Sequence, residues 1–288
     1  MYSTLISATE LQALMTSKKP LMVFDCSFEL MRPTGGDQQY QESHIAGAVR
    51  ADLDRHLSAK GAPDAASGGR HPLPSRESLA AWLSSVGLHP DMQAVVYDRQ
   101  GANYSGRLWW MLKWAGHEAA AVLDGGLQAW IAAGGAVESG AGPALQASHY
   151  PLAAPQAELV TTQAILKHLA HPTQTILDAR ATPRFRGEVE PLDPVAGHIP
   201  GAVNRFWQAN LADGRFKPAA QLRAEYEQLL AGRSPAQVVA QCGSGVTACH
   251  HLLAMHVAGL SGARLYAGSW SEWIADPSRP VAKGPQPG

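Results

Sequence analysis

The sequence predicts an α/β fold built from two copies of one domain. Short apolar runs alternate along the chain with helical patterns. The apolar runs lie at 21–24, 94–97, 175–177 and 237–240. The helical patterns lie at 75–86, 102–115, 162–170 and 245–258. Such alternation is typical of a largely parallel sheet flanked by helices on both faces. The length of 288 residues is also about twice that of a usual domain.

Four landmarks recur in the same order in both halves of the chain, which predicts an internal duplication. They pair the turn 44–49 with 198–203, Asp25 with Asp178 after an apolar run, the run 94–98 with 238–242, and the segment 124–130 with 267–273. We therefore expect one domain at 1–138 and a second at 158–288. The stretch 139–157 between them contains the glycines and prolines that are typical of linkers.

The composition argues against several classes of partner. With 23 basic and 24 acidic residues, the chain has no long-range attraction for nucleic acid. Its most apolar run, 108–112, is far shorter than the roughly 20 residues of a membrane helix. The start of the chain lacks a basic segment followed by an apolar one, so we expect no signal peptide and a cytoplasmic protein. Three cysteines without a CxxC pair favour reduced thiols over disulfides or a metal site.

One of these cysteines follows a strand of the second copy. Ligands of parallel α/β sheets collect beyond the carboxyl ends of the strands, where both Asp98 and Cys242 are expected. The strand at 237–241 leads into a loop of small residues before a helix, Cys242-Gly243-Ser244-Gly245-Val246-Thr247. This arrangement aims several backbone N–H groups at one point, which stabilises a thiolate or a persulfide anion. Because the first copy has Asp98 where the second has Cys242, only the second copy supplies a thiol at this position, and the predicted active centre is asymmetric.

A buried core thiol is the other interpretation of Cys242, because free cysteine is often buried. The Gly-Ser-Gly sequence that follows favours the active loop, since a ring of N–H groups around one atom demands backbone angles that glycine adopts most easily. The hydroxyls of Ser244 and Thr247 lie in the same loop. They are candidates to donate to a leaving group or to cap the following helix.

The loop 242–247 resembles the active loop of the 3-mercaptopyruvate sulfurtransferases, within the rhodanese superfamily. The likeness covers nearly the whole chain and includes the turn at 198–202, the segment 268–273 and the residues 104–105 and 108–110. It implies two tandem rhodanese-like domains, of which only the second is catalytic. It also implies an enzyme that moves sulfur from 3-mercaptopyruvate to a thiol or cyanide through a Cys242 persulfide, releases pyruvate and needs no cofactor.

The resemblance further indicates which donor the loop suits. Thiosulfate-preferring relatives usually carry a basic residue in the loop, whereas Gly243 and Ser244 stand at those places here. A neutral loop favours the singly charged keto acid. Related phosphatases need an arginine six residues after the cysteine, but position 248 is Ala248, so phosphatase activity is not expected.

Three arginines follow the strand at 175–177. Arginine suits a carboxylate because its planar fork donates two parallel hydrogen bonds. By resemblance Arg184 binds the substrate, whereas Arg180 is expected to make a structural ion pair with an acid near the loop. The stretch 188–196 lacks the second arginine that many mercaptopyruvate enzymes carry. Arg186, two positions further along a segment that is expected to be extended, is the alternative source.

Three residues of the first half match positions that face the substrate in the family. The resemblance gives His71 a role in proton movement or in binding the keto oxygen, has Asp54 orient His71, and lets Tyr104 donate to the substrate. Two other functions stay open, a thiosulfate:cyanide sulfurtransferase and a non-catalytic sulfur-relay module. The expected acceptor is reduced thioredoxin or a small thiol.

Overall fold

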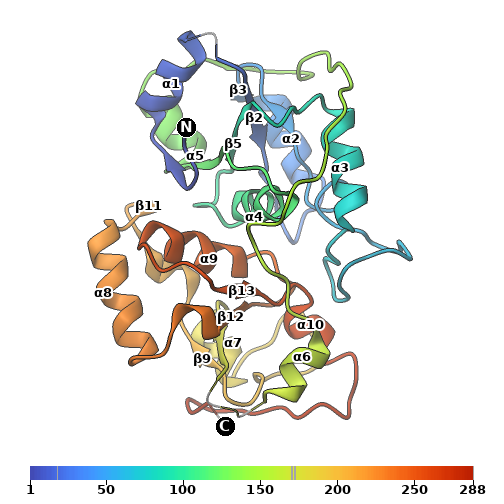
Figure 1. Ribbon diagram of the computed structural model, residues 1–288, viewed down its shortest axis with the longest axis vertical. Coiled ribbons are helices and arrows are strands. Elements are labelled where there is room, and N and C mark those ends of the chain that lie inside the picture. Colours follow the sequence, from blue (N-terminus) through green and yellow to red (C-terminus); the bar gives the residue numbers. More distant parts are fainter. Residues whose placement is uncertain (18, 170, 172, 288) are drawn as a thin grey trace. The chain divides into compact units, whose positions relative to one another are not determined.

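The computed structural model describes residues 1–17, 19–169, 171 and 173–287 (Figure 1). They form two compact units. The first unit comprises Met1–Asp64, Pro74–Gln156 and Asp213–Phe216, and the second comprises Ala65–Leu73, Ala157–Ala212 and the stretch from Lys217 onward. Residues 65–73 therefore belong to the second unit, although they lie within the first repeat of the sequence.

The first unit contains a five-stranded parallel sheet in the order β1-β6-β5-β2-β4. Its strands are β1 (Leu5–Ile6), β2 (Leu21–Asp25), β4 (Val49–Arg50), β5 (Gln93–Tyr97) and β6 (Ala120–Leu123). A short antiparallel pair joins β3 (His44–Ile45) to β7 (Val137–Glu138), and β11 (Arg215–Phe216) also belongs to this unit. The helices are α1 (Ala8–Thr16), α2 (Gly35–Glu42), α3 (Arg76–Ser85), α4 (Ser105–Ala115) and α5 (Gly126–Ala132).

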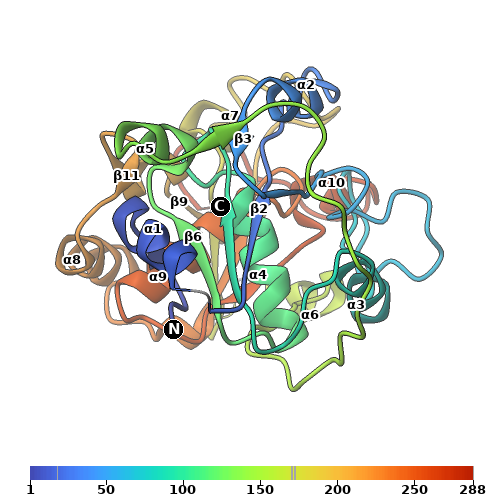
Figure 2. The same cartoon turned by 90° about the horizontal axis from the view of Figure 1, so that it is seen from above.

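Both faces of the first sheet are covered by helices. On one face, Val95 and Tyr97 pack with Trp130 of α5 in a buried cluster. On the other face, Phe24 lies against Trp82 of α3 with ring centroids 5.8 Å apart, and α4 contacts β5 and β6 (Figure 2). This double burial explains why the central strands are apolar runs rather than alternating patterns.

The second unit contains a four-stranded parallel sheet in the order β13-β12-β8-β9. Its strands are β8 (Thr175–Asp178), β9 (Val203–Asn204), β12 (Val238–Gln241) and β13 (Arg264–Leu265), and β10 (Leu211–Ala212) lies outside this sheet. The α-helices are α6 (Thr162–Lys167), α7 (Thr182–Arg186), α8 (Ala219–Leu230), α9 (Ala248–Val257) and α10 (Ser269–Trp273). Two 3-10 helices are η1 (Trp207–Asn210) and η2 (Pro235–Gln237).

The second sheet is covered in the same way. Ile176 of β8 and Val239 of β12 pack with Ile165 of α6 and Trp270 of α10 in a buried cluster. On the opposite side, α9 contacts β12 and β13 and lies beside α8 (Figure 1). Strand β12 is an inner strand of this sheet, so the residue that follows it is held by neighbours on both sides.

The predicted α/β class with parallel sheets is confirmed, and β2, β5, β8 and β12 overlap the predicted apolar runs to within one residue at each end. The helices predicted from 102 and 245 begin later, at Ser105 and Ala248, because the residues before them form the loops that follow β5 and β12. The helix predicted over 162–170 ends at Lys167, and residue 170 lies outside the described residues. Within the described ranges, no helix is long and apolar enough to cross a membrane.

Candidate active site

Strand β12 delivers Cys242 to the carboxyl end of the second sheet. The residue is 3% exposed, and the cysteine forms no disulfide. Its N–H donates to the Oγ of Ser269 at 3.0 Å, and its carbonyl accepts the N–H of Trp270 at 3.1 Å. The segment at the start of α10 thus fixes the backbone of the cysteine from one side.

The loop after Cys242 leaves several backbone donors unused. Within the described part of the chain, the N–H groups of Gly243, Ser244, Val246 and Thr247 donate to no protein acceptor. Unpaired N–H groups between a strand and a helix N-terminus form a concavity that suits an anion. The loop therefore has donors of the kind on which the prediction of a thiolate or persulfide site depends, and the stabilisation itself stays a prediction.

Gly245 gives this loop its shape. Its φ is +75°, and a Cβ at this position would lie 2.0 Å from the carbonyl oxygen of Ala267. The carbonyl of Gly243 accepts the N–H of Ser271 at 2.9 Å. The backbone at Gly245 approaches its neighbour so closely that no side chain fits there.

The corresponding loop of the first copy is filled by a carboxylate of the chain itself. Asp98 follows β5 as Cys242 follows β12, and its side chain is buried. One oxygen accepts the N–H groups of Gln100 and Ala102, each at 2.9 Å, and the other accepts two more backbone N–H groups at 2.8 Å. The first loop thus demonstrates the anion-binding geometry, with its site occupied by a side chain.

His71 lies beside the cysteine loop within the second unit. Its Nδ1 is 2.8 Å from the Oγ of Ser244, and the residue is 3% exposed. The segment that carries it is anchored where the N–H of Gly68 donates to Glu272 at 3.0 Å and the N–H of Arg70 donates to Ser271 at 2.9 Å. The serine two residues beyond Cys242 is therefore hydrogen-bonded to a histidine.

Arg184 lies close to the loop on α7. Its Nη2 pairs with Glu190 at 2.7 Å and with Asp193 at 3.2 Å, and its side chain keeps 18% exposure. Both of its Nη atoms lie 3.7 Å from the point where a Cβ on Gly243 would stand. The guanidinium is thus placed directly over the residue that follows Cys242.

Arg180 forms a buried structural pair, as predicted. Its Nη2 donates to Asp178 at 2.7 Å, and its guanidinium lies 4.7 Å from the ring of Trp270. Burial opposes its charge, but its hydrogen bond to Asp178 and the neighbouring acidic groups, chiefly Asp178 and Glu190, together raise the pKa of Arg180. This permanent cation holds the end of β8 next to the loop.

Comparison with known proteins agrees with this arrangement. The model of the rhodanese-like domain matches residues 7–133 and, a second time, residues 161–276. The chain belongs to the rhodanese family. Its two tandem rhodanese domains are confirmed, each with a parallel sheet and flanking helices.

Relatives of this rhodanese include whole-length matches. It is 49% identical over 286 residues to a probable 3-mercaptopyruvate sulfurtransferase of Pseudomonas aeruginosa, across 97% of this chain and 98% of that protein. It is 41% identical over 288 residues to a putative thiosulfate sulfurtransferase, SseB, of Mycobacterium tuberculosis, across 97% of each chain. The structure of 3-mercaptopyruvate sulfurtransferase from Leishmania major resembles it with a TM-score of 0.80 at 30% identity, across 95% of this chain and 74% of that one.

Arg186 occupies a different setting from Arg184. The prediction of an extended segment is wrong here, because residues Thr182–Arg186 form the helix α7. Successive helical residues are rotated by about 100°, so the side chains of Arg184 and Arg186 point in different directions on α7. Arg186 is partly exposed and lies 3.7 Å from Glu188, and its role as a second substrate arginine stays a prediction.

Asp54 and Tyr104 belong to the first unit. Asp54 pairs with Lys60 at 2.7 Å. Tyr104 immediately precedes α4, its ring lies edge-on to Phe28 at 5.3 Å, and burial raises the pKa of its hydroxyl. Their predicted roles toward a substrate on Cys242 concern both units and stay predictions.

Two charged residues near the loop, Arg70 and Asp193, were not predicted from the sequence. Arg70 lies in the first repeat, far in sequence from the cysteine loop, and no motif marks Asp193. Arg70 immediately precedes His71, a predicted site residue, and this adjacency was the signal in the sequence that could have placed Arg70 near the site. Although the loop 242–247 contains no basic residue, the site around it contains cations that come from other segments.

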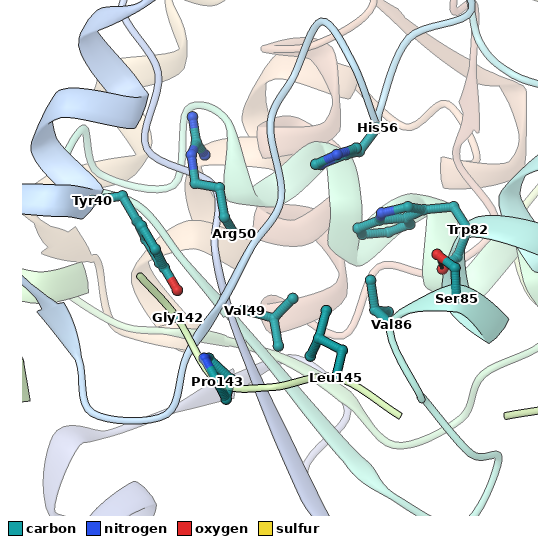
Figure 3. A pocket seen from close by; sticks show the side chains of 10 residues that line it. All are labelled: Tyr40, Val49, Arg50, His56, Trp82, Ser85, Val86, Gly142, Pro143 and Leu145. Carbon is teal, nitrogen blue, oxygen red and sulfur yellow. Dashed lines mark hydrogen bonds between the residues drawn. The ribbon is translucent and has the colours of Figure 1, made fainter. Parts of the chain in front are cut away.

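The first unit of this rhodanese has a pocket of its own, about 370 Å³ in volume (Figure 3). His56 lines it and stacks on Trp82 with ring centroids 5.4 Å apart. Arg50 also lines it, but its guanidinium pairs with Asp37 at 3.1 Å and Asp52 at 3.0 Å. The residues that line this pocket include none of the predicted site residues, so the sulfur chemistry is assigned to the Cys242 loop.

Proposed function

We propose that this rhodanese is a 3-mercaptopyruvate sulfurtransferase. The observation that carries the proposal is the almost fully buried Cys242 at the end of β12, followed by a loop in which four N–H groups are unpaired within the described ranges. The names of the relatives from Pseudomonas aeruginosa and Leishmania major support the donor.

In the first half-reaction, the Cys242 thiolate attacks the sulfur of 3-mercaptopyruvate. A sulfur–sulfur bond forms as the carbon–sulfur bond breaks, and its electron pair leaves with the enolate of pyruvate. The outer sulfur keeps its proton as Cys242-S-SH. A proton taken up at the terminal carbon of the enolate completes pyruvate.

The surrounding residues have distinct proposed roles. Arg184 binds the donor carboxylate, and the amides of Gly243, Ser244, Val246 and Thr247 stabilise the charge on sulfur. Gly245 gives the loop the backbone shape that brings these amides together. The hydrogen-bonded pair of His71 and Ser244 supplies or relays the proton for the enolate. We assign Asp54, Tyr104 and Arg186 supporting roles in orienting His71 and the substrate.

In the second half-reaction, a nucleophile takes the outer sulfur. The thiolate of a small thiol or of reduced thioredoxin, or cyanide, attacks the outer sulfur of the persulfide and releases the Cys242 thiolate. The protein thus alternates between two forms in a ping-pong cycle, without a cofactor. We place this activity in the cytoplasm.

Thiosulfate is the second candidate donor. Two arginines lie over Gly243, which suits a doubly charged anion, and a relative from Mycobacterium tuberculosis is named a putative thiosulfate sulfurtransferase. The two donors are separated by kcat/KM with one common acceptor. A larger value for 3-mercaptopyruvate supports the proposed function, and a larger value for thiosulfate would replace it.

The nucleophile is tested by replacing each buried thiol of the second unit. Cys242→Ser should abolish pyruvate release and the gain of one sulfur atom in the protein mass. Cys249→Ser is the matched control, because Cys249 is also buried and its Sγ donates to the carbonyl of Gly245 at 3.5 Å. Appreciable turnover by pure Cys242→Ser would contradict the mechanism. A wild-type protein that turned over neither small donor but accepted sulfur from a protein would support the relay module.

A further inference from the structure

Two guanidinium groups from distant parts of the chain converge on Gly243. The reference point is the position that a Cβ on Gly243 would occupy. Arg70 Nη2 lies 3.1 Å from this point, and both Nη atoms of Arg184 lie 3.7 Å from it. The space that a basic loop side chain would enter is therefore occupied by two cations supplied from outside the loop.

Arg70 is fixed in this position by its backbone and its side chain. Its N–H donates to Ser271 Oγ at 2.9 Å, and the N–H of Ser271 donates to the carbonyl of Gly243 at 2.9 Å. Its Nη1 pairs with Asp193 at 2.5 Å. Its Nε is buried and has no hydrogen-bond partner in the part of the chain that the structure describes. The guanidinium is thus held near the loop with one donor to spare.

Asp193 bridges the two arginines. Its Oδ1 accepts from Arg70 and its Oδ2 accepts from Arg184, and its side chain is only 4% exposed. A buried carboxylate between two guanidinium groups has the same charge and shape as the carboxylate of a keto acid. Asp193 therefore competes with an anionic ligand for the same N–H donors.

The charges of this cluster balance. Its cations are Arg70, Arg180 and Arg184, and its anions are Asp178, Glu190 and Asp193. A balanced cluster attracts an anion through the placement of its donors rather than through a net charge. A change of one charge in the cluster should therefore alter the preference between singly and doubly charged donors.

We propose that Arg70 is the second donor-binding cation of this site and that Asp193 sets the discrimination between donor charges. Arg70 and Arg184 together bind the oxygen end of the donor, and Arg70 takes the place of the arginine that the stretch 188–196 lacks. This inference rests on the proposed function for the identity of the donor, but not for the existence of the anion site.

The test measures binding without turnover. In the Cys242→Ser protein, calorimetry gives Kd for pyruvate, which carries one negative charge, and for thiosulfate, which carries two. Adding Arg70→Gln should weaken both by about 10-fold or more, since a charge-assisted bidentate contact is lost. Arg70→Lys in the same background should weaken binding less than Arg70→Gln does. Lysine keeps the positive charge but lacks the planar guanidinium that donates two parallel hydrogen bonds.

Asp193→Asn in the same background gives the complementary result. The change removes one negative charge from the balanced cluster. The Kd for thiosulfate should therefore fall about 10-fold, and the Kd for pyruvate should fall by a smaller factor. Arg223→Gln is the matched control for loss of an arginine charge, because Arg223 pairs with Glu227 on the exposed side of α8. It should change neither Kd.

The outcomes separate this inference from the proposed function. If Arg70→Gln leaves both Kd values unchanged in a protein with the thermal melting profile of its parent, Arg70 is not a donor-binding residue. If Arg70→Gln is misfolded, the folded Arg70→Lys decides instead, and binding equal to that of the parent overturns the proposal. If pyruvate binding depends on Arg70 while the wild-type enzyme releases no pyruvate from mercaptopyruvate, the anion site stands and the proposed function falls.

Discussion

His71 Nδ1 and Ser244 Oγ lie 2.8 Å apart, although 173 residues separate them in the sequence. Both residues are almost fully buried, at 3% and 6% exposure. A buried hydroxyl bonded to an imidazole can pass a proton in either direction, because the hydroxyl both donates and accepts. The pair thus joins a titratable group to the loop that carries Cys242.

The first prediction concerns this pair. His71→Gln and Ser244→Ala should each lower kcat for pyruvate release by about 100-fold or more, since general acid–base catalysis typically contributes about 10²- to 10⁴-fold. The double variant should be little slower than the worse single variant, because both changes break one path. Steady-state kinetics on the four proteins gives the coupling. Fully additive losses would mean that the two residues act separately.

The second prediction concerns the shape of the loop. Gly245→Ala should destabilise the second unit by more than about 3 kcal/mol, because a left-handed backbone and a severe steric conflict are combined. The conflict is with the carbonyl of Ala267, 2.0 Å from the added Cβ. Gly232→Ala is the matched control, with φ of +84° and nothing within 4 Å, and should cost only about 1–2 kcal/mol. Urea unfolding compares the two, and equal losses would contradict the steric explanation.

The third prediction concerns the buried ion pair at the end of β8. Arg180→Ala leaves Asp178, which is 0% exposed, without its partner and should cost about 3–5 kcal/mol in the free energy of unfolding. Arg186→Ala removes the same charge from the exposed end of α7 and should change it by less than about 0.5 kcal/mol. Chemical unfolding of both variants provides the measurement. A small loss for Arg180→Ala would show that water reaches Asp178.

The fourth prediction concerns stability in acid. His251 is buried on α9, its Nε2–H donates to the carbonyl of Arg205 at 2.8 Å, and its Nδ1 accepts from Tyr226 Oη at 2.7 Å. Burial lowers the pKa of His251 from 6.5 to about 3, so the folded protein holds it neutral. The unfolded chain binds a proton below pH 6.5, and stability is therefore lost as pH falls through the window from 6.5 to 3.

The size of this acid effect can be measured by difference. At pH 5 the loss relative to neutral pH should be about 2 kcal/mol from His251 alone. His251→Gln should be less stable at pH 7 but should lack this part of the pH dependence. Urea unfolding of both proteins between pH 7 and pH 5 isolates it. Parallel pH profiles would show that His251 does not titrate on unfolding.

The inner strands could be predicted from the sequence because a sheet covered on both faces needs continuous apolar runs. The stretch from Ala94 to Tyr97 in β5 is such a run, and each of its residues is buried. The loop of Cys242 could also be predicted from the sequence, since its small residues lie next to each other in the chain. Short elements such as β1 and β9 were not predicted, because two residues carry no periodicity.

The residues around the loop were harder to predict than the loop itself. Arg184 and His71 came from family resemblance, whereas Arg70 and Asp193 are assigned only by distances between segments far apart in the sequence. The sequence shows that an arginine is present but not which residues surround it. An arginine beside carboxylates can be a structural ion pair or part of a ligand site, and only the positions of its neighbours distinguish the two.

The assignment of residues 65–73 to the second unit has a practical consequence for dissecting this enzyme. A protein cut between the repeats and expressed as its second half would retain Cys242 and Arg184 but lose Arg70 and His71. The two repeats of the sequence thus do not coincide with the two units of the structure, because the second unit includes a segment that lies within the first repeat. The catalytic unit is therefore discontinuous in the sequence, and no single cut between the two repeats yields all of it.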